Sequence, residues 1–165
     1  PEGLPRLMPI GRLDLNSEGL LLLTNDGELK RRLELPSTGW LRRYRVRVFG
    51  TPDDTALQAL GRGVTVGGVV YGPIQAKLER VQGSNSWLVV ALREGKNREV
   101  RNVMEHLGHE VSRLIRSGYG PFQLGALEPR GIEEVRPKVL KEQLGLAVAG
   151  KPRPAERAQS RTARG

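Results

Sequence analysis

The stretch that says most about the fold covers residues 9–29 and reads PIGRLDLNSEGLLLLTNDGEL. Asp14 lies in a glycine-bounded loop that leads into the apolar run 20–23, and this pattern predicts a strand that holds a loop carboxylate in place. Asp26 follows in a turn and is a suitable N-cap for a helix over about 28–35, which Pro36 would close. Taken alone, Asp14 is a typical turn or capping residue.

Further along the chain, hydrophobic periodicity predicts short strands and helices. Residues 43–48 alternate arginine with an aromatic or β-branched residue, which is the period of a strand with one basic face. Helices are expected from about residue 52 to about residue 60, over 97–107 and over 137–144. Strands are expected within 64–81, over 87–92 and over 111–115. Hairpin-like links among the central strands favour an α+β fold, with a mixed, largely antiparallel sheet flanked by helices.

Charge is the most informative property of the composition. The net charge is +9, and residues 151–165, with five Lys or Arg and one Glu, leave +5 for residues 1–150. A basic folded body favours a polyanionic partner, most often nucleic acid, although a basic protein without such a partner remains an alternative. The absence of cysteine excludes disulfides and thiolate metal sites, two histidines are too few for a convincing metal cluster, and the run 20–23 is too short to span a membrane.

The composition also predicts a boundary near residue 146, between a folded domain and a tail. Residues 1–146 are predicted to form one domain of ordinary size. Residues 147–165 are small, polar, basic or proline and cannot bury enough apolar surface to offset their ordering entropy, so they are expected to be a disordered basic tail.

Several motifs together change the interpretation of Asp14. Residues 11–14, 17–22 and 24–29 closely resemble the active-site motif of one family of bacterial ribosomal RNA pseudouridine synthases. This family includes type A, which modifies the RNA of the small ribosomal subunit, and types B, E and F, which modify that of the large one. The resemblance implies the pseudouridine synthase catalytic fold. It also implies that Asp14 is the essential carboxylate, which attacks the uridine during isomerisation.

Two downstream segments match the same family in the family's order. Residues 43–46 resemble its second motif, and the resemblance implies that Tyr44 packs on the target base. Residues 93–101 resemble the third motif, whose last arginine, here Arg101, pairs with the catalytic aspartate. Without the resemblance, Tyr44 would be a strand tyrosine of the core and Arg101 part of a solvated helix face.

Residues 111–120 resemble the family strand that follows the third motif, so the matches run from residue 4 to about residue 145. The details at 97–101 and 111–116 look most like type B of the large-subunit enzymes. One departure is Asn102-Val103, where relatives usually carry a second basic residue and a bulkier apolar one. This departure puts an RNA contact in doubt but leaves the chemistry intact.

The resemblance implies an enzyme that isomerises a uridine of large-subunit ribosomal RNA without a cofactor or metal, in the cytoplasm and as a monomer. Arg12 would fill the space that the flipped base vacates. The expected RNA contacts are Arg12, Arg42, Arg43, Arg45, Arg47, Lys96 and Arg98, although simple solvation explains any single one equally well.

In this family an S4-type RNA-binding domain usually precedes the catalytic domain, and nothing in residues 1–165 resembles it. The opening strand of the catalytic domain is also expected to be missing. One alternative function is a non-catalytic RNA-binding or ribosome-assembly module with the same fold. Another is a DNA-binding protein that uses helix 97–107, but this helix offers few exposed base-reading side chains.

Overall fold

The computed structural model describes residues 6–35, 38–96, 98–144 and 158–163. Its strands are β1 (Met8–Ile10), β2 (Glu18–Thr24), β3 (Arg42–Phe49), β4 (Val64–Val66), β5 (Val69–Tyr71), β6 (Ile74–Gln82), β7 (Asn85–Leu92), β8 (Val111–Tyr119), β9 (Phe122–Gln123), β10 (Ile132–Glu134) and β11 (Ala158–Ala163). Its helices are α1 (Gly27–Glu34), α2 (Asp54–Ala59), α3 (Glu99–His106) and α4 (Pro137–Leu144), and a 3₁₀ turn at Leu60–Arg62 directly follows α2.

One mixed sheet organises the molecule. Its strand order is β10-β11-β2-β8-β3-β7-β6, with β1 paired to β2 and β9 paired to β8. The pairing of β2 with β8 is parallel, and the other pairings in this sheet are antiparallel. Strands β4 and β5 form a separate antiparallel pair. This architecture confirms the expected α+β fold with a mixed, largely antiparallel sheet.

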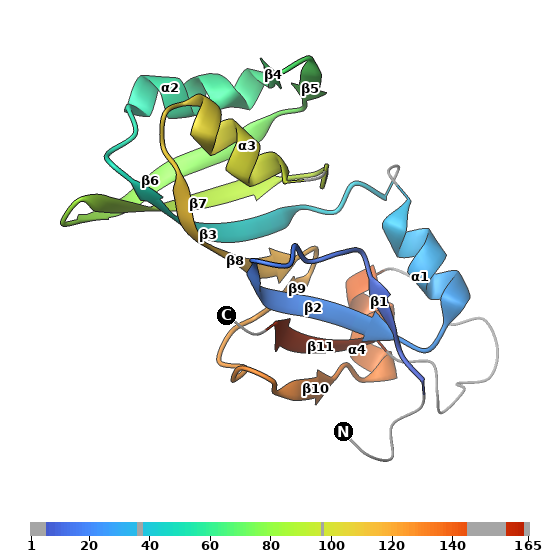
Figure 1. Ribbon diagram of the computed structural model, residues 1–165. Helices are drawn as coiled ribbons and strands as arrows, with labels where there is room; N and C mark the ends of the chain where they lie inside the picture. Colours follow the sequence, from blue (N-terminus) through green and yellow to red (C-terminus); the bar gives the residue numbers. More distant parts are fainter. Residues whose placement is uncertain (1–5, 36–37, 97, 145–157, 164–165) are drawn as a thin grey trace.

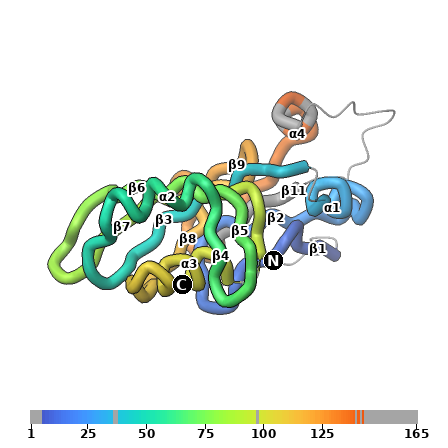
Figure 2. Tube along the Cα trace, turned by 90° about the horizontal axis from the view of Figure 1, so that it is seen from above, coloured from blue at the N-terminus to red at the C-terminus, as the bar shows by residue number. Residues whose placement is uncertain are grey.

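The sheet has two halves with separate cores (Figure 1). In the first half, α2 and α3 cover one face of β3, β6 and β7, and the core there includes Val46, Leu88 and Val103. In the second half, α1 lies beside β1 and β2, and the core includes Leu22 and Leu140. The view from above shows that α1 and α4 lie at the end of the molecule away from the loop that joins β6 and β7 (Figure 2).

Several local expectations are confirmed. Asp26 is the N-cap of α1, and its Oδ1 accepts hydrogen bonds from the backbone N–H groups of Glu28 (3.0 Å) and Leu29 (3.2 Å). The structure starts α3 at Glu99, two residues later than expected, and residue 97 lies outside the described residues. Strand β8 continues four residues beyond the expected end at residue 115. In the part of the chain that the structure describes, no helix is long and apolar enough to cross a membrane.

The C-terminal segment differs from the sequence expectation. Within the predicted tail 147–165, residues Ala158–Ala163 form β11, which lies between β2 and β10 and pairs antiparallel with both. The prediction of disorder is therefore wrong for these six residues, while 147–157 and 164–165 lie outside the described residues. The composition argument failed because strand pairing satisfies backbone donors and acceptors whatever the side chains are.

Candidate active site

The loop between β1 and β2 carries Asp14 to the boundary between the two halves. Its downstream end is fixed where β2 lies parallel to β8, with Gly19 opposite Arg116. Gly19 has a φ of +111°, and a Cβ added there would lie 2.2 Å from the Arg116 carbonyl oxygen, so glycine is required at this contact. The backbone N–H of Ser17 donates to the carbonyl oxygen of Asp14 (2.9 Å), which closes a turn. Backbone contacts thus hold the loop in one shape.

Two arginines from the α3 region surround the Asp14 carboxylate. Asp14 Oδ2 lies 3.3 Å from Arg98 Nη1 and 3.6 Å from Arg101 Nε. Arg101 also donates from Nη2 to the carbonyl oxygen of Asn16 (2.7 Å), and its side chain is only 12% exposed. Burial and the neighbouring Arg98 lower the pKa of Arg101, whereas Asp14 acts in the opposite direction. The expected proximity of Arg101 to Asp14 is present, and Arg98 adds a second cation.

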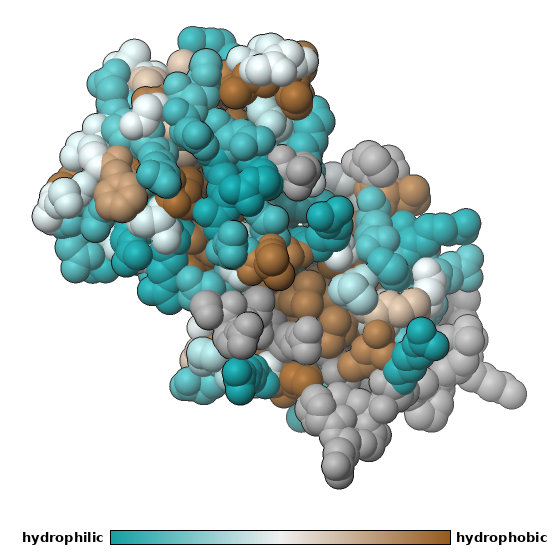
Figure 3. All heavy atoms as spheres, viewed as in Figure 1, coloured by the Kyte–Doolittle hydropathy of each residue, from teal (hydrophilic) through white to brown (hydrophobic). Residues whose placement is uncertain are grey.

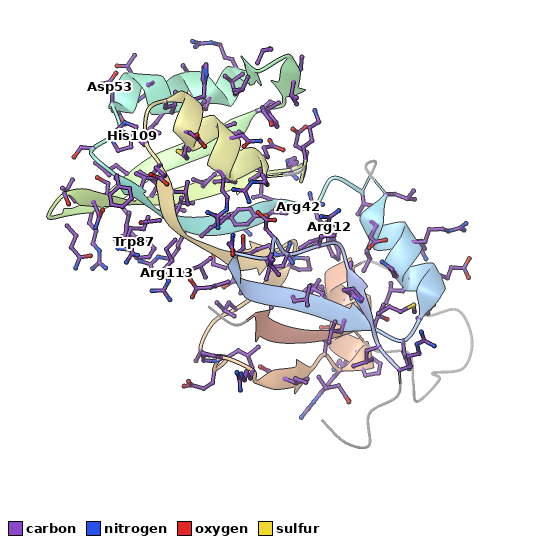
Figure 4. All side chains as sticks on the ribbon, in the orientation of Figure 1. Arg12, Arg42, Asp53, Trp87, His109 and Arg113 are labelled. Atoms are coloured by element: carbon purple, nitrogen blue, oxygen red, sulfur yellow. The ribbon has the colours of Figure 1, made fainter. Side chains whose placement is uncertain are left out.

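A cavity of about 320 Å³ opens beside this carboxylate. Its walls come from the 11–17 loop, β3, β8 and the segment that leads into α3, and its lining residues include Asp14, Tyr44, Arg12, Arg42, Lys96, Arg98, Glu99 and Arg116. Arg101 lies next to Asp14 and is not among the lining residues. Figure 4 labels Arg12 and Arg42 where the two halves meet, and Figure 3 shows hydrophilic side chains gathered in that region. The cavity is basic and holds Asp14 and Tyr44 together.

Arg116 is a site residue that the sequence analysis did not single out. It is 1% exposed and donates from Nε to the carbonyl oxygen of Leu20 (2.9 Å) and from Nη1 to that of Arg12 (3.0 Å). Burial lowers its pKa, while Tyr44 and Tyr119 beside the guanidinium act in the opposite direction. Nη2 makes no hydrogen bond of good geometry. The signal was present in the sequence, because Arg116 follows the buried Leu114 at the period of a strand's inward face.

Arg42 lies on the other side of the cavity among aromatic rings. Its Nη1 donates to the Arg93 carbonyl oxygen (2.9 Å), and its guanidinium lies 5.0 Å from the centre of the Tyr119 ring. Trp40 packs edge-on against the same tyrosine, with ring centres 5.6 Å apart. Stacking on an aromatic ring reduces the rotamer freedom of Arg42, so its charge is held at the cavity wall.

The segment before α3 is held by two carboxyl groups. Glu94 Oε2 accepts a hydrogen bond from the Gly72 backbone N–H (3.1 Å), and Glu99 Oε1 accepts one from the Lys96 backbone N–H (3.1 Å). Burial, together with a hydrogen bond to Glu94, raises the pKa of Glu99 to about 8, so Glu99 carries a proton at neutral pH. This pair fixes the backbone that presents Lys96 and Arg98 to the cavity.

Three of the arginines that are expected to contact RNA do not line the cavity. Arg12, Arg42, Lys96 and Arg98 line the cavity, but Arg43, Arg45 and Arg47 do not. In the sheet register, Tyr44 lies beside Val90 and Arg116, whereas Arg45 lies beside Val89 and Ile115. Adjacent residues of a strand point to opposite faces, so these three arginines lie on the face opposite the cavity. The alternation that directs Tyr44 to the cavity directs its neighbours away, and their contact with RNA stays a prediction.

The described residues contain no group of three or more His, Cys, Asp or Glu side chains that could hold a metal ion. The chemistry that the cavity offers is instead that of a carboxylate paired with two guanidinium groups, next to a phenol and a buried arginine. A carboxylate in such surroundings is suited to nucleophilic or general-base work on a substrate with negative charge nearby.

Comparison with known proteins gives a consistent result. Residues 1–106 match the family model described as RNA pseudouridylate synthase. A relative in Rickettsia bellii, named "Uncharacterized RNA pseudouridine synthase", is 51% identical over 139 residues, which are 84% of this chain and 60% of that protein. The "Ribosomal large subunit pseudouridine synthase B" of Escherichia coli K12 is 48% identical over 128 residues, which are 76% of this chain and 43% of that protein.

Structural similarity agrees with the sequence matches. A solved structure titled "Crystal structure of pseudouridylate synthase" superposes with a TM-score of 0.63 and 29% sequence identity, over 72% of this chain and 50% of that one. The chain spans about 60% of the length of the Rickettsia bellii relative. The family model, the relatives and the shared fold lead to one conclusion: this chain belongs to the RNA pseudouridylate synthase family.

Proposed function

We propose that this chain carries the catalytic part of an RNA pseudouridine synthase that modifies a uridine of large-subunit ribosomal RNA. The observation that carries the proposal is the pairing of Asp14 with Arg98 and Arg101 at the wall of a cavity that Tyr44 also lines. The similarity to the large-subunit pseudouridine synthase B of Escherichia coli supports the choice of RNA.

The reaction breaks the bond between C1′ and N1, turns the base and joins C1′ to C5. The proton at C5 leaves and N1 gains one, so the product is an isomer and the reaction needs no redox partner or energy source. Asp14 acts as the nucleophile that detaches the base. Tyr44 offers a flat face to the base while it turns and assists the removal of the C5 proton.

The cations beside Asp14 make this role chemically reasonable. Arg98 and Arg101 pair with the carboxylate at 3.3 and 3.6 Å and so fix its orientation. Arg116 holds the carbonyl oxygens of Arg12 and Leu20, and therefore the backbone on both sides of Asp14.

The cavity is also suited to a nucleotide that has left its stack. Flipping a base out of a helix costs a few kcal/mol, which contacts with the protein must offset. Arg12 is exposed at the edge of the cavity and is positioned to occupy the space that the base leaves. Arg42, Lys96 and Arg98 supply positive charge for the phosphates next to the target nucleotide.

The test compares the intact chain with Asp14→Asn on unmodified large-subunit ribosomal RNA, with pseudouridine mapped by chemical probing. The intact chain should modify a single site and Asp14→Asn none, because the amide is a far weaker nucleophile than the carboxylate. Asp53→Asn is the matched control, since Asp53 is exposed and lies beside α2, away from the cavity (Figure 4).

Equal modification by the intact chain and Asp14→Asn would remove Asp14 from the mechanism. Binding of the RNA by the intact chain without any modification would favour the alternative function, a non-catalytic RNA-binding or ribosome-assembly module.

A further inference from the structure

The sheet face opposite the cavity carries a group of basic side chains. In the register of the sheet, Arg80, Trp87, Arg47 and Arg113 form one row across β6, β7, β3 and β8, and Lys77, Val89, Arg45 and Ile115 form the next. Arg43 lies one row further along β3 on the same face. We call the set formed by Arg43, Arg45, Arg47, Lys77, Arg80 and Arg113 the basic face.

Trp87 orders the middle of the basic face. Although it points away from the core of the first half, it is only 5% exposed. The guanidinium of Arg45 lies 4.7 Å from the centre of its ring system, and that of Arg47 lies 5.8 Å away. Cation–π stacking of this kind lowers the entropy cost of using an arginine in a contact. Trp87 therefore keeps the guanidinium groups of Arg45 and Arg47 in positions from which they can contact a ligand.

Carboxylates neutralise only part of this charge. Glu79 lies 2.8 Å from Arg45, and Glu18 accepts two hydrogen bonds of 2.8 Å from Arg113. Among the described residues, only two carboxylates, those of Glu79 and Glu18, form ion pairs with these six basic side chains. Arg43, Lys77 and Arg80 are exposed and have no ion pair among the described residues. The face keeps a positive excess that attracts a polyanion.

Among the described elements, none covers this face. Helices α2 and α3 lie on the other side of β3, β6 and β7 (Figure 1), and Trp87 and Arg113 project from the uncovered side (Figure 4). The basic face extends about 13 Å along β3 and about 14 Å across the four strands, from standard strand dimensions. Several consecutive phosphates of one RNA segment fit on such an area.

The surface chemistry favours RNA over a protein partner. The centre of a protein–protein interface is rich in apolar area and depleted in charged residues as a group, although arginine itself is enriched there. Here the hydrophobic residues of the two rows are Trp87, which is only 5% exposed, Val89, which is 39% exposed, and the half-buried Ile115. Several exposed cations on one face instead suit a sugar–phosphate backbone, whose phosphates pair with Arg and Lys side chains.

We propose that the basic face is a second RNA-binding surface, which holds the backbone of a large substrate RNA at a segment other than the one that contains the target uridine. The choice of RNA rests on the proposed function, but binding at this face requires no turnover. The sheet separates the face from the cavity, so a short hairpin bound at the cavity does not reach it. Only an extended or folded RNA engages both surfaces.

The experiment uses the triple variant Arg43→Gln, Lys77→Gln and Arg80→Gln in the full chain. Binding is measured at several salt concentrations with two RNAs: a large-subunit ribosomal RNA transcript and a short hairpin around the mapped uridine. For the transcript, affinity should fall by at least about tenfold, and the slope of log affinity against log salt should become shallower by about 2 to 3. Affinity for the hairpin and the turnover rate on it should stay within about twofold.

A second triple variant, Arg62→Gln, Arg136→Gln and Lys138→Gln, removes the same charge from exposed positions outside the cavity and the basic face. It should leave the affinity for both RNAs close to that of the intact chain. The proposal is overturned if both triples weaken transcript binding equally, if the face variant binds the transcript normally, or if it loses the hairpin to the same extent. Turnover on the hairpin reports separately on the proposed function.

Discussion

Arg116 connects the backbone on the two sides of the catalytic candidate Asp14. One guanidinium holds the carbonyl oxygens of Leu20, in β2, and Arg12, in the loop, while it remains almost fully buried. Hydrogen bonds to a charged group contribute about 1.5–3 kcal/mol, so this arginine limits how far the loop can move. The position of the Asp14 carboxylate therefore depends on a residue from β8, about a hundred positions later in the chain.

At this residue, Arg116→Lys should lower kcat on the hairpin RNA by at least about tenfold. A lysine keeps the charge but is a single-point donor that lacks the planar fork needed to reach both carbonyl oxygens, so the loop loses part of its alignment. Multiple-turnover assays at saturating RNA measure kcat, and the melting temperature of the variant is measured beside it. Arg136→Lys, at an exposed position, is the control. An unchanged kcat with Arg116→Lys would remove this arginine from the positioning of Asp14.

Among the elements, the segment that leads into α3 depends on a protonated carboxyl group. The pKa of Glu99 is raised from 4.5 to about 8 by burial and by its hydrogen bond with Glu94. Below pH 4.5 the folded and unfolded states both carry this proton. As pH rises from 4.5 to about 8, the unfolded state releases the proton first, so the folded state loses stability across this window.

Glu99→Gln should therefore flatten the pH dependence of stability. From this group, the intact chain should lose up to about 1.4 kcal/mol of unfolding free energy per pH unit between pH 5 and 8, and the variant should not. Urea unfolding at several pH values measures the difference. Glu105→Gln, at an exposed position of the same helix, should keep the profile of the intact chain. Parallel profiles for Glu99→Gln and the intact chain would contradict the burial argument.

Across the whole molecule, β11 joins β2 to β10 and so completes one end of the sheet. Replacing Ser160, which pairs with Leu22 on one side and Glu133 on the other, by proline should lower the unfolding free energy by about 3 kcal/mol. The ring removes a backbone donor from a strand with neighbours on both sides. Ser160→Ala keeps the backbone pairing and serves as the control in urea unfolding. Equal stability of the two variants would show that β11 contributes little.

The sequence predicted those features of the fold that depend on local side-chain patterns. The alternation in residues 43–48 predicted β3, and the position of Asp26 predicted the start of α1. The pairing of Asp14 with Arg101 followed from the family resemblance, because no local pattern relates residues that far apart. Arg116 was missed since a strand arginine is usually a surface residue, and β11 was missed since its stability comes from backbone pairing.

The position of β2 has a consequence for how the protein is made. β2 ends at Thr24, but the strands that flank it, β8 and β11, are translated roughly 90 to 140 residues later. Because translation adds about 5–20 residues per second, on the order of ten seconds pass between the synthesis of β2 and that of β11, the last of its neighbours to be made. The loop that carries Asp14 therefore cannot reach its final shape before β8, which carries Arg116, has been made. Until then, β2 is exposed to chaperones and to premature association with other nascent chains.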